Sequence, residues 1–136
     1  MRLTEYPAYY NGSFCQIQDL KVSILDLGFI HSDATYDVIA IKDREFVNLD
    51  AHLKRFAKSC YGWRIPLKYS KEDLEAILRT LYVKVPLDVK DCLVWIAITR
   101  GVPKSGNPRD LLACEPNFYA YIKPYFGFNA QNTATV

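Results

Sequence analysis

The sequence predicts a small α+β domain in which an antiparallel or mixed sheet is covered by two helices. Two segments have the apolar spacing of amphipathic helices, and strand-like segments lie before, between and after them. The chain has 136 residues, of which 50% are hydrophobic, so it is long enough to bury a core as one domain. We expect this small two-layer domain to span residues 1–125.

The first strands lie near the N-terminus. Residues 7–14 predict a short strand that is interrupted by the turn pair Asn11-Gly12, which is typical of a hairpin. Residues 22–25 contain β-branched and apolar side chains and are expected to continue this strand.

A turn and a second hairpin follow. Residues 26–29 are typical of a turn, in which Gly28 is free to take a positive φ. The β-branched, alternating residues 36–41 predict a longer strand. A polar hairpin tip is expected at 42–45, with the return strand starting at 46–47.

The first helix is expected over residues 51–61, with Asp50 as its N-cap and Gly62 at its end. Apolar residues at i, i+3, i+4 and i+7 form one stripe, which predicts a buried face. The stripe consists of Leu53, Phe56, Ala57 and Cys60.

A second helix is predicted after Ser70, which has the spacing of a capping box with Asp73. Pro86 is expected to prevent its continuation. Its apolar stripe consists of Leu74, Ile77, Leu78 and Leu81.

The last third of the chain predicts two more strands. Residues 92–99 are continuously apolar, which indicates a strand buried on both faces. A loop with Gly and Pro at 100–111 separates this strand from the last one at 118–122. Residues 126–136 are expected to be a linker toward a missing C-terminal domain, or a frayed end.

Composition argues against several classes of function. The net charge is only +2 and the basic residues are scattered, so we expect no nucleic-acid partner. The cysteines and histidines lack the close spacing of a metal site. No signal peptide is recognisable, and the longest apolar run is too short to cross a bilayer. We therefore expect a cytoplasmic protein without a metal ion or a membrane partner.

Three motifs carry a resemblance to a known family. Residues 26–38 (DLGFIHSDATYDV) are similar to the D-x-G-[FY]-x-x-[GS]-D-x-x-[YF]-[DE] signature of the class IV aminotransferases. Residues 50–60 (DAHLKRFAKSC) resemble the family's H-[LI]-x-R helix, and residues 98–101 (ITRG) resemble its strand-ending T-R-G. The motifs occur in the family's order, and the match covers about residues 9–125. The sequence of residues 30–38 is most similar to that of the (R)-selective amine transaminases.

The resemblance implies the N-terminal domain of an enzyme that uses pyridoxal 5′-phosphate. Arg55 lies off the apolar stripe of its helix, so the residue alone is typical of a solvated arginine. The resemblance implies instead that its guanidinium binds the cofactor phosphate, which a two-pronged donor suits well. Tyr36 is implied to reach the cofactor and form a wall of the substrate site, although a core tyrosine is an equal alternative.

Two further residues are implied to bind substrate. His31 corresponds to a residue that lines the substrate pocket of its own or a neighbouring subunit. Arg109 corresponds to an arginine on a mobile loop that binds a substrate carboxylate in relatives, and loops of this composition often carry binding residues. Arg100 is expected to be structural.

The sequence contains no residue that matches the family's catalytic lysine, which lies in the second domain of family members. We therefore expect the parent protein to move an amino group between an amino acid or primary amine and a keto acid, and this chain alone to be inactive. A homodimer is expected from the resemblance. Two alternatives remain open: a non-catalytic remnant that serves as an interaction or anion-binding module, and a lyase on the same fold.

Overall fold

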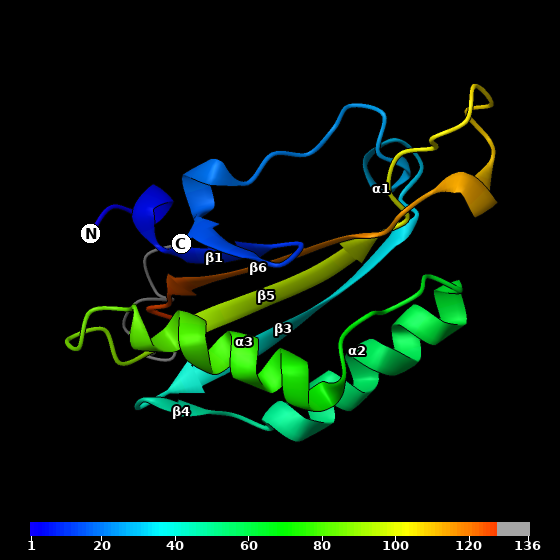
Figure 1. The fold of residues 1–136 in the computed structure, drawn as a ribbon. Coiled ribbons are helices and arrows are strands. Elements are labelled where there is room, and N and C mark those ends of the chain that lie inside the picture. The colour runs from blue at the N-terminus through cyan, green and yellow to red at the C-terminus, as the bar shows by residue number, and fades with distance from the viewer. Residues whose placement is uncertain (128–136) are drawn as a thin grey trace.

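A computed structural model of the chain describes residues 1–127. In it the chain forms one antiparallel sheet with two long helices on one face of the sheet (Figure 1). The strands are β1 (Pro7–Tyr10), β2 (Ser13–Gln16), β3 (Ala34–Lys42), β4 (Glu45–Phe46), β5 (Cys92–Thr99) and β6 (Asn117–Pro124). The α-helices are α1 (Leu27–Ile30), α2 (Leu49–Trp63) and α3 (Lys71–Val83). Short 3-10 turns lie at Leu3–Glu5, Ile17–Asp19 and Leu111–Ala113.

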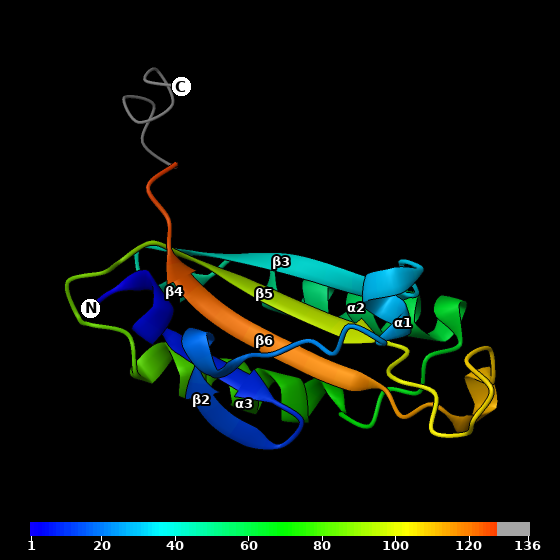
Figure 2. The same cartoon turned by 90° about the horizontal axis from the view of Figure 1, so that it is seen from above.

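The sheet has the strand order β2-β1-β6-β5-β3-β4, and all neighbouring strands are antiparallel. Helices α2 and α3 cover one face, whereas the chain from β2 to α1 runs over the other, which we call the open face (Figures 1 and 2). The predicted fold class, a two-layer α+β domain with two covering helices, is therefore confirmed.

The core lies between the sheet and these two helices. Side chains alternate along a strand, so one set of residues from β3, β5 and β6 points to the helices. The buried stripe of α3 is the predicted one, and α2 adds Leu49, Leu53, Phe56 and Cys60. The strand side of this core includes Ile39, Ile41, Val94, Ile96, Ile98, Phe118 and Ile122.

Most predicted strands are present, but residues 22–25 do not form one. β2 ends at Gln16, and a 3-10 turn then directs the chain away from the sheet edge. Val22, Ile24 and Leu25 are more than half exposed, because the crossing segment has no strand to pair with. Local β-propensity was overruled here by the lack of a partner strand.

Gly28 does not use the freedom of a glycine to take a positive φ. It lies inside the one-turn helix α1, whose N-cap is Asp26. A Cβ on Gly28 would lie 2.6 Å from Cβ of Thr99, so this glycine is required by close packing against the end of β5.

The predicted limits of α2 were also wrong. The helix begins at Leu49, because Leu49 is buried and Asn48 adopts a left-handed conformation before it. Asp50 instead pairs with Lys54 and Lys71. At the other end α2 continues through Gly62 to Trp63.

The residue that ends α2 is Arg64, which has a left-handed conformation, and not the expected Gly62. Within the predicted apolar stripe of α2, Ala57 was wrongly assigned to the buried face. It is exposed, and Leu49 completes the face instead.

Several composition-based expectations bear on the described residues. The predicted linker lies almost wholly outside them, since its residues 128–136 are not described. No helix within residues 1–127 is long and apolar enough to cross a membrane. The four cysteines are unpaired, and burial raises the pKa of the thiols of Cys60 and Cys92 to about 11.

Phe56 provides a test of the core. Its side chain is fully buried on α2 and contacts Phe118 edge-to-face at 6.2 Å between ring centroids. We expect Phe56→Ala to lower the free energy of unfolding by about 3–5 kcal/mol, because it leaves a cavity. Lys58→Ala, an exposed change on the same helix, should alter it by no more than about 0.5 kcal/mol. Chemical denaturation of both variants checks this, and equal effects would contradict the assigned core face.

Candidate functional site

Asp37 lies at the centre of a polar cluster between β3 and the first half of α2. Alternation along β3 places Asp37 on the helix-covered face of the sheet, together with Ile39 and Ile41. Its side chain is only 4% exposed, so its negative charge needs hydrogen-bonding partners. His52 and Arg55 of α2 are these partners.

His52 and Arg55 are three residues apart and therefore lie on the same face of α2. Nε of Arg55 donates to Oδ2 of Asp37 at 2.8 Å, and Nη2 of Arg55 lies 2.8 Å from Oδ1. Nδ1 of His52 also lies 2.8 Å from Oδ1. The motif spacing H-x-x-R thus serves to hold one buried carboxylate, a contact that the sequence analysis did not foresee.

The electrostatics of this cluster follow from its contacts. Burial acts to raise the pKa of Asp37, but the hydrogen bonds from Arg55 and His52 outweigh it and hold that pKa below its ordinary value. The bond to Asp37 raises the pKa of Arg55. The side chain of Arg55 is nevertheless 65% exposed, as its position off the apolar stripe predicted. Nε and Nη2 of the guanidinium are bound to Asp37, and most of the surface of the Arg55 side chain remains accessible to a ligand.

Tyr36 precedes Asp37 on β3 and therefore points to the open face, where it is exposed. Its ring lies 6.4 Å from that of Trp95, and Trp95 stacks on Tyr121 at 5.1 Å between centroids. Tyr36, Trp95 and Tyr119 line a groove of about 440 Å³. Residues 20–29 contribute Leu20, Val22 and Phe29 to the same groove. Of the two alternatives for Tyr36, the exposed position excludes a core tyrosine.

Arg55 and Tyr36 flank the same edge of the sheet from opposite faces. β4 pairs only with Ile41 and Lys42 of β3, so no strand pairs with the outer edge of β3 beside Tyr36 and Asp37 within the described part of the chain. An open strand edge with a cationic side chain on one face and an aromatic side chain on the other can receive a molecule that carries both an anion and a flat ring.

His31 and Arg109 lie at one end of the sheet, in the two loops that follow α1 and β5. His31 lines a hollow of about 240 Å³ together with Pro103 and Pro108, so the structure brings its loop next to the one that carries Arg109. Arg109 is exposed, and among the described residues no partner is found for its side chain. The structure therefore does not bring these two residues into contact with Arg55.

The D-x-G and T-R-G motifs contact each other across the end of β5. Asp26 is fully buried and accepts hydrogen bonds from the backbone of Gly28 and from the hydroxyl of Thr99, both at 2.8 Å. The backbone N–H of Leu27 donates to the carbonyl of Gly101 at 3.0 Å. Gly101 has φ +92°, and a Cβ there would lie 1.9 Å from the carbonyl oxygen of Glu115. These motif residues are structural: they fix the loop that leads into β3.

Asn117 extends this contact to the first hairpin, and the sequence analysis missed it. Its amide donates to Asp26 at 3.0 Å, and its carbonyl oxygen accepts from the amide of Asn11 at 3.0 Å. Asn11 in turn accepts from the backbone N–H of Phe118 at 2.7 Å. A buried carboxylate with neutral donors from α1, β5 and β6 thereby joins these three elements, and Asn117 links them to the turn between β1 and β2.

Arg100 is structural, as expected. It forms a two-bond contact with Asp33 at 2.9 and 3.1 Å. It also donates to the carbonyls of Trp63 and Arg64, each at 2.8 Å. Arg100 thus satisfies carbonyls at the C-terminal end of α2, where the helix itself has no donors left.

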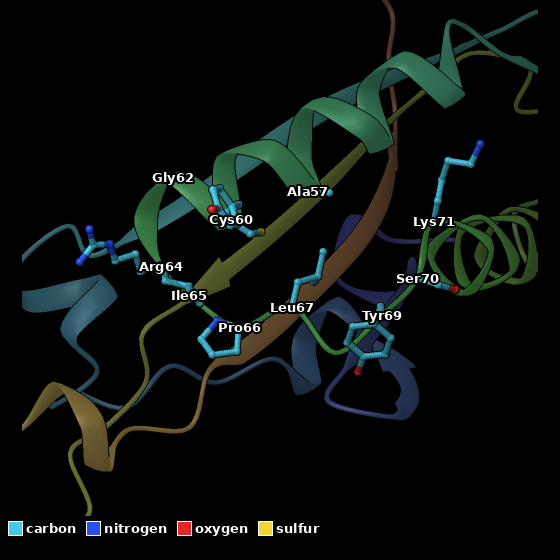
Figure 3. A pocket seen from close by; sticks show the side chains of 11 residues that line it. Ala57, Cys60, Gly62, Arg64, Ile65, Pro66, Leu67, Tyr69, Ser70 and Lys71 are labelled. Atoms are coloured by element: carbon cyan, nitrogen blue, oxygen red, sulfur yellow. The ribbon is translucent and has the colours of Figure 1, made fainter.

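A further hollow is lined by none of the four predicted site residues. It has a volume of about 930 Å³ and lies between the end of α2, residues 64–70 and the start of α3 (Figure 3). Figure 3 shows Arg64 pointing away from Lys71 across this hollow. Lys71 is paired with Asp50, so it is not available as a single positive charge for a ligand.

Solved structures show which proteins share this fold. The chain is similar to a T.th. branched-chain amino acid aminotransferase complexed with N-(5′-phosphopyridoxyl)-L-glutamate, with a TM-score of 0.80 and 16% identity over 94% of the chain and 43% of that protein. An Escherichia coli branched-chain amino acid aminotransferase gives a TM-score of 0.77 and 17% identity over 89% of the chain and 41% of that protein. The fold is thus that of part of an aminotransferase.

Sequence comparisons identify the family. The family model "Amino-transferase class IV" matches residues 34–128, and the chain belongs to this family. It is 28% identical to the D-alanine aminotransferase of Staphylococcus aureus strain MSSA476 over 117 residues, which are 86% of the chain and 41% of that protein. A putative branched-chain-amino-acid aminotransferase of Methanocaldococcus jannaschii is 31% identical over 103 residues, or 74% of the chain and 35% of that protein. The chain therefore spans about two fifths of the length of these relatives.

Asp37 gives a pH-dependent prediction. Because its pKa in the folded protein lies below the unfolded value, the ionised carboxylate stabilises the fold at pH values above about 4. This contribution is lost as the pH falls through the lowered pKa of the folded state. We expect Asp37→Asn to cost about 1.5–3 kcal/mol at pH 7, the range for hydrogen bonds to charged groups. Urea unfolding from pH 7 to pH 2 checks this, and a difference from wild type that does not shrink in acid would refute it.

Proposed function

We propose that the chain is the N-terminal part of a pyridoxal-phosphate-dependent aminotransferase, which moves an amino group between an amino acid or primary amine and a keto acid. The observation that carries the proposal is the exposed guanidinium of Arg55, held in place by Asp37 beside an open strand edge. Family membership supports it, as do the printed names of the relatives, which are D-alanine and branched-chain aminotransferases.

The residues present fit a phosphate-bearing, ring-containing cofactor. Arg55 supplies an exposed cation with donors that match phosphate oxygens. Tyr36 supplies an aromatic wall on the other side of the same strand. When bound, pyridoxal phosphate supplies the electron sink for proton removal from the amine substrate. In this proposal Arg55 anchors the phosphate, and Tyr36 orients the ring and excludes water.

Substrate contacts are proposed for Tyr36, His31 and Arg109. The loops that carry His31 and Arg109 are neighbours, which supports a shared role at the entrance to the site. Arg109 has a side chain free of recorded partners within residues 1–127, so it is available for a substrate carboxylate.

A second domain is proposed to supply the catalytic lysine. The chain spans about two fifths of its relatives, and none of its lysines lies in the cluster of Arg55, His52 and Asp37. We propose residues 1–125 as the N-terminal domain and a homodimer as the active assembly. A reading frame that continues downstream into a lysine-bearing domain would support this arrangement.

A non-catalytic anion-binding module is the second candidate function, because the same Arg55 would bind a phosphate without any chemistry. The two functions differ in one observable. A transaminase, completed by its second domain, converts the cofactor between its aldehyde and amine forms when amino and keto substrates are added, whereas a binding module leaves it unchanged. Absorbance spectra of the complete protein with each substrate distinguish them.

Arg55 provides the test of cofactor binding. In a complete protein that carries this chain and a lysine-bearing second domain, we expect Arg55→Ala to weaken retention of pyridoxal phosphate by about one to two powers of ten, from the loss of charge-assisted hydrogen bonds. Lys58→Ala, which removes a positive charge from the same helix, should leave retention within about twofold, since exposed charges separated from a ligand are screened. Equilibrium dialysis measures both. Full retention by Arg55→Ala would assign Arg55 to structure alone.

A further inference from the structure

His52 occupies a position between one donor and one acceptor. Its Nδ1 lies 2.8 Å from Oδ1 of Asp37 and 3.2 Å from Nη2 of Arg55. An ionised carboxylate only accepts hydrogen bonds, and a guanidinium only donates them. Nδ1 can satisfy only one of these neighbours. The shorter contact is with Asp37, which favours the tautomer in which Nδ1 carries the hydrogen and donates it to the carboxylate.

When Nδ1 carries the hydrogen of the neutral ring, Nε2 has none and is the nitrogen of His52 that can accept a proton from solvent. Among residues 1–127, neither Nε2 of His52 nor Nη1 of Arg55 has a recorded hydrogen-bond partner. The His52 side chain is 22% exposed, so part of it is accessible to solvent. Asp37 therefore orients two neighbouring side chains and leaves an unused nitrogen on each.

The charges of the cluster constrain what it binds. Asp37 and Arg55 form a pair with no net charge, so with neutral His52 the cluster binds a dianion through the open donor of Arg55 without a net positive charge. Protonation of His52 makes the cluster cationic and turns Nε2 into a second donor. An anion with two negative charges therefore favours the protonated state.

Other charged groups near α2 do not change the net charge of the cluster of Asp37, Arg55 and His52. β3 contributes only Asp37 to this face of the helix, since Lys42 lies at the far end of that strand and is exposed. From α3, Lys71 contacts α2 at Asp50, which also pairs with Lys54. Within the described residues, Asp37 and Arg55 are the charged side chains recorded in contact with His52.

We propose that His52 is a second phosphate-binding residue beside Arg55, that Asp37 is the positioning residue for both, and that binding of a dianion is coupled to protonation of Nε2 of His52. The proton comes from solvent and is returned to it when the anion leaves. This inference rests on the proposed function, because it concerns the same phosphate site, but it makes a claim about the chain itself that needs neither the cofactor nor the second domain.

The chain as it stands permits a direct test by NMR of ¹⁵N-labelled histidine side chains. It contains only two histidines, His31 and His52, so His52→Gln assigns both sets of signals. In the neutral state we expect His52 to carry its proton on Nδ1, and Asp37→Asn to remove this preference. A neutral His52 with its proton on Nε2 would overturn the proposal, whatever the outcome of any binding experiment.

Sulfate is the probe for binding, because it remains a dianion across the whole pH range, unlike a phosphate ester whose second pKa is about 6. We expect sulfate to displace the His52 signals and to bind more weakly at pH 7.5 than at pH 5.5, by at most about tenfold per pH unit, the limit for linkage to one proton. His52→Gln should bind with less than about twofold pH dependence on the same argument. Lys58→Gln, a matched loss of a non-titrating cation on α2, should retain the full dependence.

The outcomes separate this inference from the proposed function. An unchanged pH dependence in His52→Gln, or sulfate that leaves the His52 signals in place, would reject the role of His52 even if pyridoxal phosphate binds the complete protein. Conversely, a proton-coupled response of His52 to sulfate would stand if the complete protein failed to transaminate. Far-UV circular dichroism of each variant establishes that it is folded before its binding is compared.

Discussion

A buried carboxylate must be paired, and at Asp37 this constraint determines how the edge strand and its covering helix meet. The charge lies on the helix side of β3, and the two residues that satisfy it come from one face of α2. The register of α2 against the sheet is thereby tied to the orientation of Arg55. Stability and the proposed ligand binding involve the same three side chains, so we expect a change at Asp37 to affect both.

In the fold, the family motifs divide into residues with structural contacts and residues for which we propose a function. Asp26, Gly28, Thr99 and Gly101 hold the loop before β3 through buried hydrogen bonds and close packing. Arg55 and Tyr36, by contrast, bury only a minor part of their surface. A non-catalytic descendant would need the first group to fold but not the second. The exposed, oriented guanidinium is therefore the feature that favours a binding site over a mere scaffold.

Sequence patterns predicted the elements whose formation depends on local chemistry, and missed those set by distant contacts. The apolar stripe of α3, its Ser70 cap and the β5 strand follow from periodicity and capping. Gly28 was misinterpreted because its constraint comes from Thr99, which is distant in the sequence, and no local pattern reports such a contact. In the site, the helical wheel correctly predicted an exposed Arg55. Its partner Asp37 lies on another element, and a single sequence does not reveal such a pairing.

The central claim is that Asp37 holds Arg55 so that the rest of its guanidinium receives a phosphate group. A crystal structure of the complete protein with pyridoxal phosphate tests this most directly. The account predicts a phosphate oxygen within hydrogen-bonding distance of Nη1 of Arg55, while Nε and Nη2 remain on Asp37. A phosphate bound elsewhere, or an Arg55 that releases Asp37 to reach it, would contradict the account.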